Sequence, residues 1–319
     1  MNHFEEYIAE WYDTIPEGGG TAASPWKIEW NDVPYKERDT RPLSRLKVLG
    51  AMKEVLFNGT PTQRAAVYIH IPFCTSRCVY CDFYSTTCGE KDKAYISALT
   101  NELRLRANYL QQDGQMPVIE TIYIGGGTPS TLDASLLEPI FEALFQTYNV
   151  SDRAEVTIEA NPDDLTPRKI KSLHTLPVNR LSMGVQTFDD GKLRLLHRRH
   201  SGEQAIRAVH DCQDTGFDNI SIDLIYAYRH NPSRMETDVD TALSLNVQHI
   251  SAYALIYEEG TPLWKMRKRH VVEEADEELS LEMFSLLMCR LENAGFEHYE
   301  ISNFARPGFR SRHNSSYWK

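Results

Sequence analysis

The chain has 319 residues, of which 41% are hydrophobic and 25% are charged. That length suffices for one large domain of barrel size with an additional segment at each end. The formal net charge of -11 excludes a global basic field of the kind that attracts nucleic acid or anionic membranes. No stretch approaches the roughly 20 apolar residues that span a bilayer, so we expect no transmembrane segment.

The compartment is indicated by the N-terminus and by the cysteines. The N-terminus is acidic and lacks the basic and apolar regions of a signal peptide. Six cysteines in a chain of this length do not make a secreted disulfide scaffold. We therefore expect a protein of the reducing cytoplasm.

Residues 1–65 contain Pro16, the Gly18-Gly19-Gly20 turn and a polar, proline-interrupted stretch through Pro42. They carry no functional motif. Such a composition is typical of a surface extension, and we expect this segment to be an N-terminal extension of the main domain.

From Ala66 onward, strand-like apolar runs alternate with segments of helical period. The expected strands are Ala66–Ile71, Thr121–Ile124, Glu155–Glu159, Arg180–Gly184, Asn219–Leu224 and His249–Leu255; the expected helices are about Lys93–Leu110, Ala134–Tyr148, Pro167–Leu173, Gly202–Thr215 and Arg234–Leu245. This alternation predicts right-handed βαβ units and a parallel sheet. Six units fall short of a full eight-fold barrel. The sequence thus predicts an α/β fold with a partial (β/α)6, TIM-like barrel over residues 66–260, followed by the start of a C-terminal accessory region over 261–319.

Three cysteines, Cys74, Cys78 and Cys81, follow the first expected strand with the spacing C-x3-C-x2-C. Thiolates are soft ligands, and three of them on one short loop can converge on one iron–sulfur cluster. A [4Fe–4S] cluster held by three thiolates keeps one iron open, as catalytic metal sites keep an open position. The alternatives are a zinc site or three unligated thiols, but zinc usually takes four protein ligands and no second cysteine pair follows.

The expected strands end in polar or glycine-rich residues. The cysteine loop follows the first strand, and the next four strand ends carry Gly125–Thr128, Glu159, Gln186 and Asp223. Because the chemistry of α/β barrels lies at the C-terminal ends of the strands, these positions predict one binding rim. Taken singly, each has a simpler explanation: a glycine triplet is usually a turn, and the polar residues can be caps or satisfied groups of the barrel interior.

Several segments resemble a known family. They are Tyr68-Ile-His-Ile-Pro-Phe-Cys74, Gly125-Gly-Gly-Thr-Pro129, Ile158-Glu-Ala-Asn-Pro162, Arg180-Leu-Ser-Met-Gly-Val-Gln186 and Ser221-Ile-Asp-Leu-Ile-Tyr226. Together they look like the oxygen-independent coproporphyrinogen III oxidase group of the radical S-adenosylmethionine (SAM) superfamily, over about residues 66–319. Within that group the chain most resembles the HemW-type haem chaperones. The oxidases place a fourth cysteine where this chain has Phe83, and Arg312-His313-Asn-Ser-Ser-Tyr317-Trp318 also looks like the chaperone branch.

The resemblance implies roles for individual residues. It implies a radical SAM-type partial barrel whose [4Fe–4S] cluster is held by Cys74, Cys78 and Cys81. It assigns SAM binding to Tyr68, Gly126, Gly127, Thr128, Glu159, Gln186, Arg198 and Asp223. It further implies haem binding by His313 and Tyr317, although His313 can equally be a cap beside Arg312. The neighbours Arg199 and His200 are expected to form a solvated basic helix end.

The function that the resemblance implies is that of a haem chaperone, which binds haem and transfers it to haem-dependent proteins. The alternative is an oxygen-independent coproporphyrinogen III oxidase, in which an electron donor such as flavodoxin or ferredoxin supplies the cluster and SAM is cleaved. A radical haem-modifying or haem-degrading enzyme is a third possibility. Phe83 favours the carrier.

Some residues depart from the family pattern or receive no role. The run Ile225-Tyr-Ala-Tyr228 replaces the usual family continuation, and the chain stops at Lys319 where relatives continue, so we expect a truncated accessory region. Cys88 is not assigned to the cluster, and Cys212 and Cys289 are expected to be small buried hydrophobic residues. The basic run Lys265–His270 is expected to be a loop that opens an exposed helix rather than a site for porphyrin propionates.

Overall fold

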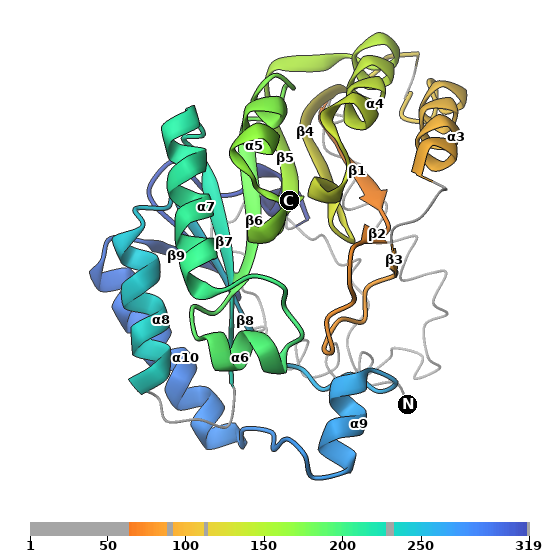
Figure 1. The fold of residues 1–319 in the computed structure, drawn as a ribbon. Helices are drawn as coiled ribbons and strands as arrows, with labels where there is room; N and C mark the ends of the chain where they lie inside the picture. The colour runs from red at the N-terminus through yellow and green to blue at the C-terminus, as the bar shows by residue number, and fades with distance from the viewer. Residues whose placement is uncertain (1–63, 88–91, 112–113, 228–232, 318–319) are drawn as a thin grey trace, which may run out of the picture. The chain divides into compact units, whose positions relative to one another are not determined.

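The computed structural model describes residues 64–87, 92–111, 114–227 and 233–317 (Figure 1). Residues 1–63, and with them almost all of the expected N-terminal extension, lie outside the described residues. So do Cys88, Tyr228 and Trp318.

The main sheet is a parallel one that is extended at one edge. Its strand order is β1-β4-β5-β6-β7-β8-β10-β9. The parallel strands are β1 (Arg64–Ile71), β4 (Val118–Gly126), β5 (Val150–Ala160), β6 (Arg180–Gln186), β7 (Ile220–Tyr226) and β8 (His249–Ala254). The antiparallel strands β10 (Asn303–Ala305) and β9 (Glu297–Glu300) follow β8. All six expected strands are confirmed, and the curled sheet is the expected partial barrel.

Helices connect the parallel strands and lie on one face of the sheet (Figure 1). They are α3 (Asp92–Leu105), α4 (Ala134–Thr147), α5 (Pro167–His174), α7 (Gly202–Thr215) and α8 (Ser233–Ser244), which confirms the five expected helices. The remaining elements were not expected as such: α6 (Asp190–Leu195), α9 (Pro262–Lys268), α10 (Glu277–Asn293), α11 (Arg312–Ser316), the 3-10 turns η2 (Pro129–Thr131) and η3 (Pro162–Asp164), and the small sheet of β2 (Phe73–Cys74) and β3 (Thr86–Thr87).

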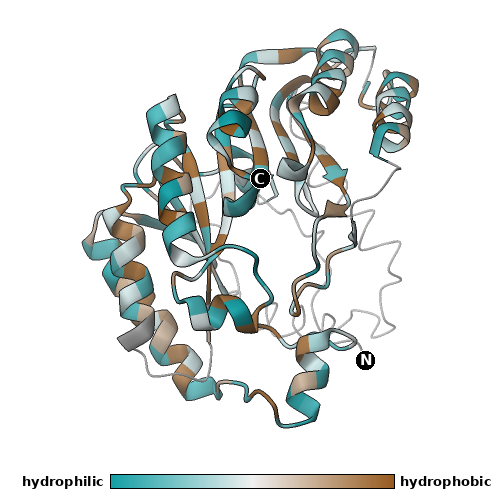
Figure 2. Ribbon diagram, in the orientation of Figure 1, coloured by the Kyte–Doolittle hydropathy of each residue, from teal (hydrophilic) through white to brown (hydrophobic). Residues whose placement is uncertain are grey.

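The core fills the space between the sheet and these helices. Ile122 and Ile124 of β4 are fully buried in one cluster with Leu137 and Ile140 of α4. Figure 2 shows hydrophobic residues concentrated on the strands and alternating with hydrophilic ones along the helices. Because side chains alternate along a strand, this packing sends the intervening residues, such as Tyr123, to the other face of the sheet. That face is the interior of the partial barrel.

Helix α11 docks at the end of the chain against β4 and β5. Glu155 accepts hydrogen bonds from the backbone amides of Arg312 and His313, each at 3.0 Å. Ser311 caps the helix by accepting a hydrogen bond from the amide of Asn314. A carboxylate at a helix N-terminus satisfies amides that have no partner within the helix. The segment that resembles the chaperone motif is therefore built into the barrel.

The basic run Lys265–His270 is helical through Lys268, and only Arg269 and His270 follow the helix. This helix is α9, which begins at Pro262 after the cap Thr261, whose hydroxyl accepts a hydrogen bond from the amide of Trp264 at 3.2 Å. Threonine followed by proline is a strong signal for a helix start. The expectation was wrong because the charge pattern outweighed that signal. Among the described residues, no helix is long and apolar enough to cross a membrane.

Candidate functional site

The cysteine loop begins at β2, in the small sheet of β2 and β3, and is anchored at two points. The amide of Val79 donates to the carbonyl of Leu196 at 3.3 Å, and its own carbonyl accepts from the amide of Leu263 at 2.9 Å. None of the five cysteines that the structure describes is in a disulfide, and Cys74, Cys78 and Cys81 are all half-buried. The loop thus presents three thiols between the end of α6 and the start of α9.

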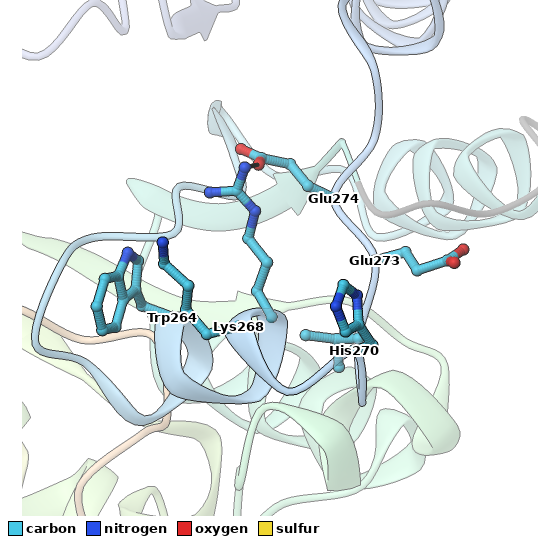
Figure 3. A pocket seen from close by; sticks show the side chains of 7 residues that line it. Trp264, Lys268, His270, Glu273 and Glu274 are labelled. Carbon is cyan, nitrogen blue, oxygen red and sulfur yellow. Dashed lines mark ion pairs between the residues drawn. The ribbon is translucent and has the colours of Figure 1, made fainter.

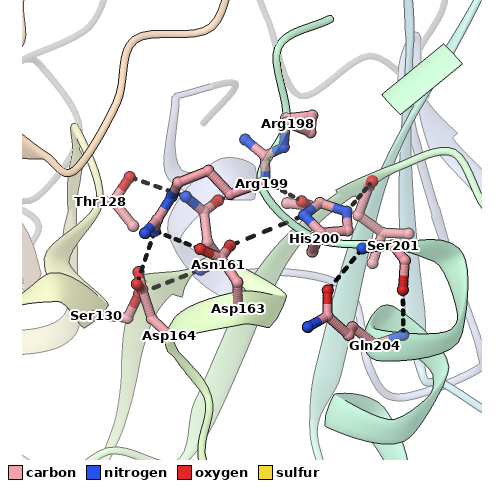
Figure 4. Close-up of polar contacts among 12 residues, drawn as sticks. Thr128, Ser130, Asn161, Asp163, Asp164, Arg198, Arg199, His200, Ser201 and Gln204 are labelled. Atoms are coloured by element: carbon pink, nitrogen blue, oxygen red, sulfur yellow. Dashed lines mark hydrogen bonds and ion pairs between the residues drawn. The ribbon is translucent and has the colours of Figure 1, made fainter. Parts of the chain in front are cut away.

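Two of these thiols are connected by side chains from the strand ends. Cys74 Sγ lies 3.6 Å from Thr128 Oγ1. Thr128 Oγ1 accepts a hydrogen bond from Asn161 Nδ2 at 3.3 Å (Figure 4). Asn161 Oδ1 in turn accepts from Arg198 Nη2 at 2.6 Å, and Arg198 Nη1 donates to Cys78 Sγ at 3.4 Å. Arg198 also donates to the carbonyl of Gly184 at 2.5 Å. The residues of three different strand ends therefore hold the cysteine loop.

The three thiols fit an iron–sulfur cluster better than a single metal ion. Among the described residues, no three histidine, cysteine or acidic side chains are placed as ligands of one ion. A [4Fe–4S] cluster does not require the three thiolates to converge on one ion, because each thiolate binds a separate iron. Burial raises the pKa of Cys81, and the neighbouring thiols of Cys78 and Cys74 add to the rise. Binding to iron relieves this cost, since a coordinating thiol is deprotonated by the metal.

A second group of polar residues surrounds Glu159 inside the barrel. Glu159 accepts hydrogen bonds from the hydroxyl of Tyr123 at 2.8 Å and from the amide of Gly126 at 3.0 Å. Tyr68 stacks on Tyr123 with ring centroids 6.1 Å apart. Burial raises the pKa of Tyr68 to about 12, with a further contribution from the charge of Glu159.

Two carboxyl groups share this interior, and both resist ionisation. Burial raises the pKa of Glu159, although the hydrogen bonds from Tyr123 and Gly126 oppose the rise. Burial and the charge of Glu159 raise the pKa of Asp223 to about 7. Each residue keeps some exposure to the interior of the barrel. Both can therefore take part in hydrogen bonds with a polar ligand.

The backbone is strained where β6 and β7 end. Gln186, the last residue of β6, has a φ of 70°, and Ala227, which follows β7, has a φ of 61°. The left-handed region is unfavourable for residues with a Cβ, and such residues cluster at functional sites. The strain turns the chain sharply at the rim on which Asp223 also lies.

The glycines after β4 allow protein groups to approach closely. A Cβ on Gly127 would lie 2.7 Å from the carbonyl oxygen of Phe73, and one on Gly126 would lie 2.4 Å from the ring of His70. The amides of Gly127 and Thr128 already donate to the carbonyls of Ile71 and Phe73. These glycines pack the end of β4 against the cysteine loop.

The segment after α6 is solvated only in part. His200 is 4% exposed, and one ring nitrogen lies 3.0 Å from the carbonyl oxygen of Val185. Burial, together with the charge of Arg198, lowers the pKa of His200 to about 4. Arg199 forms ion pairs with Asp163 and Asp164 (Figure 4). The expectation is wrong for His200, which is buried. Arg199 is exposed, as expected, but it pairs with acidic partners from η3, which is distant in sequence.

His313 and Tyr317 lie away from the cysteine loop. His313 is 3% exposed, and its two ring nitrogens contact the hydroxyls of Thr121 at 2.9 Å and Tyr317 at 3.2 Å. Its ring stacks on Tyr123 with centroids 5.0 Å apart. The histidine is thus a buried part of the barrel interior and not a cap on the surface.

The structure therefore brings the residues implied by the resemblance into two adjoining groups. Thr128 and Arg198 contact the cysteines, whereas Tyr68, Gly126 and Asp223 are grouped with Glu159 through Tyr123 and through the interaction of the two carboxyl groups. Tyr123 and Asn161 were not predicted as site residues from the sequence. Asn161 lies in the segment Ile158–Pro162, which resembles the family. Tyr123 lies between the buried residues Ile122 and Ile124 of β4, and this alternation could have indicated that it faces the barrel interior.

Other cysteines follow the expectation only in part. Cys212 is buried in the core, as expected, and burial raises its pKa to about 12. Cys289 is exposed, because it falls on the outer side of α10.

Comparison with known proteins places this site in a family. The radical SAM superfamily profile matches residues 68–242, which include the cysteine loop and the strand ends through β7. The chain belongs to the radical SAM superfamily. Its radical SAM domain therefore contains all the contacts that connect Cys74 through Thr128, Asn161 and Arg198 to Cys78.

Relatives of the chain carry two kinds of name. It is 39% identical over 255 residues to "Heme chaperone HemW" of Lactococcus lactis and 38% identical over 257 residues to the protein of that name from Bacillus subtilis, each match covering 79% of this chain. It is 34% identical, over 81% of its length, to "Radical S-adenosyl methionine domain-containing protein 1, mitochondrial" of Bos taurus, of which 58% is covered. The chain spans 65% and 66% of the length of the two bacterial relatives.

Solved structures share the fold of this radical SAM domain. Coproporphyrinogen III oxidase (HemN) from Escherichia coli superposes with a TM-score of 0.69 at 22% identity, covering 86% of this chain and 62% of that one. Elp3 of the archaeon Methanocaldococcus infernus superposes with a TM-score of 0.53 at 19% identity, covering 72% of this chain and 54% of that one. These similarities support the partial-barrel fold.

The raised pKa of Asp223 predicts a pH-dependent effect of its replacement. An aspartate whose pKa rises on folding stabilises the folded chain at low pH and loses that contribution as pH rises from its unfolded value, near 4, to about 7. Asp223→Asn should therefore leave stability at pH 4 nearly unchanged and raise it at pH 8, by at most about 4 kcal/mol and by less where water screens the charge.

Chemical unfolding of both ligand-free proteins across this pH range measures the difference. A difference that is constant with pH, or larger at pH 4, would contradict the assigned shift.

Proposed function

We propose that this chain is a haem chaperone of the radical SAM superfamily, which holds a [4Fe–4S] cluster and SAM and transfers haem to haem-dependent proteins. The observation that carries the proposal is Phe83, which stands where the oxidases have a fourth cysteine and is 72% exposed. The names of the relatives that are 38% and 39% identical support the same function.

The proposal keeps the expected division of the chain into 1–65, 66–260 and 261–319. One boundary of the described elements supports it, because α9 begins at Pro262 after the last parallel strand. A cytoplasmic location also belongs to the proposal. The five described cysteines form no disulfide with one another, which fits a reducing compartment.

We assign the cluster to Cys74, Cys78 and Cys81. The support is the set of three half-buried thiols on one loop, two of which contact Thr128 and Arg198. When bound, the cluster supplies an open iron for SAM and a route for electrons, whose donor would be a flavodoxin or a ferredoxin if SAM is cleaved.

Cys81→Ala should abolish the intact cluster, because only two of the three thiolates that hold it would remain. Iron and acid-labile sulfide are measured after anaerobic reconstitution. Cys289→Ala is the matched control, since this exposed thiol lies on α10 and should leave the cluster content unchanged. Full cluster content in Cys81→Ala would refute the assignment.

We assign SAM binding to the rim and to the barrel interior: Tyr68, Gly126, Gly127, Thr128, Glu159, Gln186, Arg198 and Asp223. Glu159 and Asp223 offer acceptors for ribose hydroxyls or for the ammonium group, and Arg198 offers donors to a carboxylate. The hydrogen bond from Tyr123 fixes the orientation of Glu159. The position of Arg198 beside Cys78 supports a carboxylate site next to the cluster.

Glu159→Gln should weaken SAM binding by about 10- to 150-fold, because a hydrogen bond to a charged group contributes about 1.5–3 kcal/mol. Calorimetry on the cluster-loaded protein measures the affinity. Glu155→Gln is the control, since Glu155 is a carboxylate on the same strand that holds α11. Equal affinities of the two variants would remove Glu159 from the site.

Haem binding by His313 and Tyr317 remains a prediction. Both ring nitrogens of His313 contact hydroxyl groups and the ring is buried. Ligation of iron, which uses a free imidazole nitrogen, would therefore require one of these two contacts to break and the buried ring to become accessible. Haem binding by this motif would therefore be coupled to a rearrangement of the contacts of His313.

The carrier and the oxidase differ in stoichiometry. A carrier should bind about one haem per chain and release no oxidised porphyrinogen, whereas an oxidase turns over many substrate molecules. Full-length, cluster-loaded protein is titrated with haem under anaerobic conditions and is separately given coproporphyrinogen III, SAM and a reductant. Repeated turnover of the porphyrinogen without haem binding would contradict the proposed function.

A further inference from the structure

A pocket of about 470 Å³ lies on α9 and the segment that follows it (Figure 3). That volume falls within the range of pockets that hold small molecules. Its walls include Trp264, Lys268, His270, Val272 and the ion pair of Arg267 with Glu274. None of the residues that line this pocket belongs to the cysteine loop or to the group around Glu159.

One wall combines an aromatic plane with a positive charge. Lys268 Nζ lies 5.1 Å from the centre of the Trp264 ring. In Figure 3 the two side chains lie next to each other, and Glu273 points away from them on the far side of His270. A half-buried indole offers a flat apolar surface, and a lysine beside it can pair with a carboxylate. The wall therefore suits a flat, conjugated ligand that carries carboxylate groups.

The second cation is held in place. Arg267 pairs with Glu274 at 2.7 Å and lies over the ring of Tyr257 at 5.8 Å. These contacts fix the segment after α9 against the helix. Lys268 is thus the cation that can change its conformation to pair with a ligand, whereas Arg267 maintains the shape of the pocket.

His270 occupies a backbone position at which glycine is usual. The amide of His270 donates to the carbonyl of Arg267 at 2.9 Å, and the amide of Val271 donates to the carbonyl of Met266 at 3.0 Å. This is the helix-ending pattern whose central residue has a left-handed conformation, and His270 has a φ of 57°. A side chain with a Cβ is strained there, so the imidazole is present at the expense of backbone stability. It is exposed at the edge of the pocket.

The pocket is joined to the cysteine loop through the first turn of α9. Leu263 donates its amide to Val79 and packs in a small apolar cluster with Val79 and Tyr80. Val272, from the pocket wall, packs against the same cluster. A ligand in the pocket would therefore lie one helix away from the loop that carries Cys78 and Cys81.

We propose that this pocket binds haem, with the macrocycle against Trp264 and Val272, a propionate on Lys268 and the iron within reach of the His270 imidazole. The proposal rests on the haem-carrying function and assigns it a site. An exposed histidine can ligate iron without rearrangement of the barrel, unlike His313. The apolar macrocycle of haem suits Trp264 and Val272, its carboxylates suit Lys268, and its iron suits the imidazole of His270.

The test is a haem titration of the full-length, cluster-loaded protein, followed by the Soret band. His270→Gly should shift the band and weaken binding by about tenfold or more, and it relaxes the strained backbone, so loss of folding does not explain the result. Trp264→Leu and Lys268→Glu should weaken both haem and metal-free protoporphyrin IX, whereas His270→Gly should weaken haem alone. Arg269→Gln is the control, because it removes one charge from the same helix end outside the pocket lining.

The outcomes separate this site from the function. If the parent protein binds haem and all three pocket variants keep its spectrum and affinity, the pocket is not the haem site, while the carrier function stands. If the parent protein binds no haem, both proposals fail. If His270→Gly keeps the Soret band but Trp264→Leu and Lys268→Glu lose affinity, the iron ligand assigned here is wrong.

Discussion

The buried guanidinium of Arg198 is the interaction on which the geometry of the site depends. It donates to Asn161 after β5, to the carbonyl of Gly184 in β6 and to the thiol of Cys78. Burying a charge is costly unless it is hydrogen-bonded, so these acceptors must stay where they are for the barrel to close around it. The cysteine loop, which has few backbone contacts of its own, is held against the strand ends by this constraint.

The same fold gives the loop a polar interior to face. Strand alternation places Ile122 and Ile124 against the helices and leaves Tyr123 to hold Glu159 from the opposite side. The interior reaches from this carboxylate to His313, whose ring stacks on Tyr123. Changes at α11 can therefore reach the Glu159 group through one aromatic ring, and changes at the cysteine loop can reach α9 through Val79.

Much of the fold could be predicted because the strand and helix periods are strong and local. The six parallel strands and five connecting helices follow from residue patterns, and the cysteine spacing located the loop. The error at α9 was local, because the Thr261-Pro262 helix start was outweighed by the charge pattern. The errors at the site concern long-range partners. The burial of His200 depends on contacts with Val185 and Asp163, and Arg199 depends on two aspartates of η3, none of which a local charge pattern reveals. Tyr123 and Arg198 gain their roles only when separate strands meet.

The central claim is that the three cysteines hold a cluster with an open iron beside a SAM site. Electron paramagnetic resonance of the reduced, reconstituted protein, recorded with and without SAM, tests this most directly. The account predicts that SAM changes the spectrum of the cluster and that Glu159→Gln, which leaves the three cysteines and their contacts unaltered, needs a higher SAM concentration for the same change. A parent spectrum that is identical with and without saturating SAM would contradict the claim.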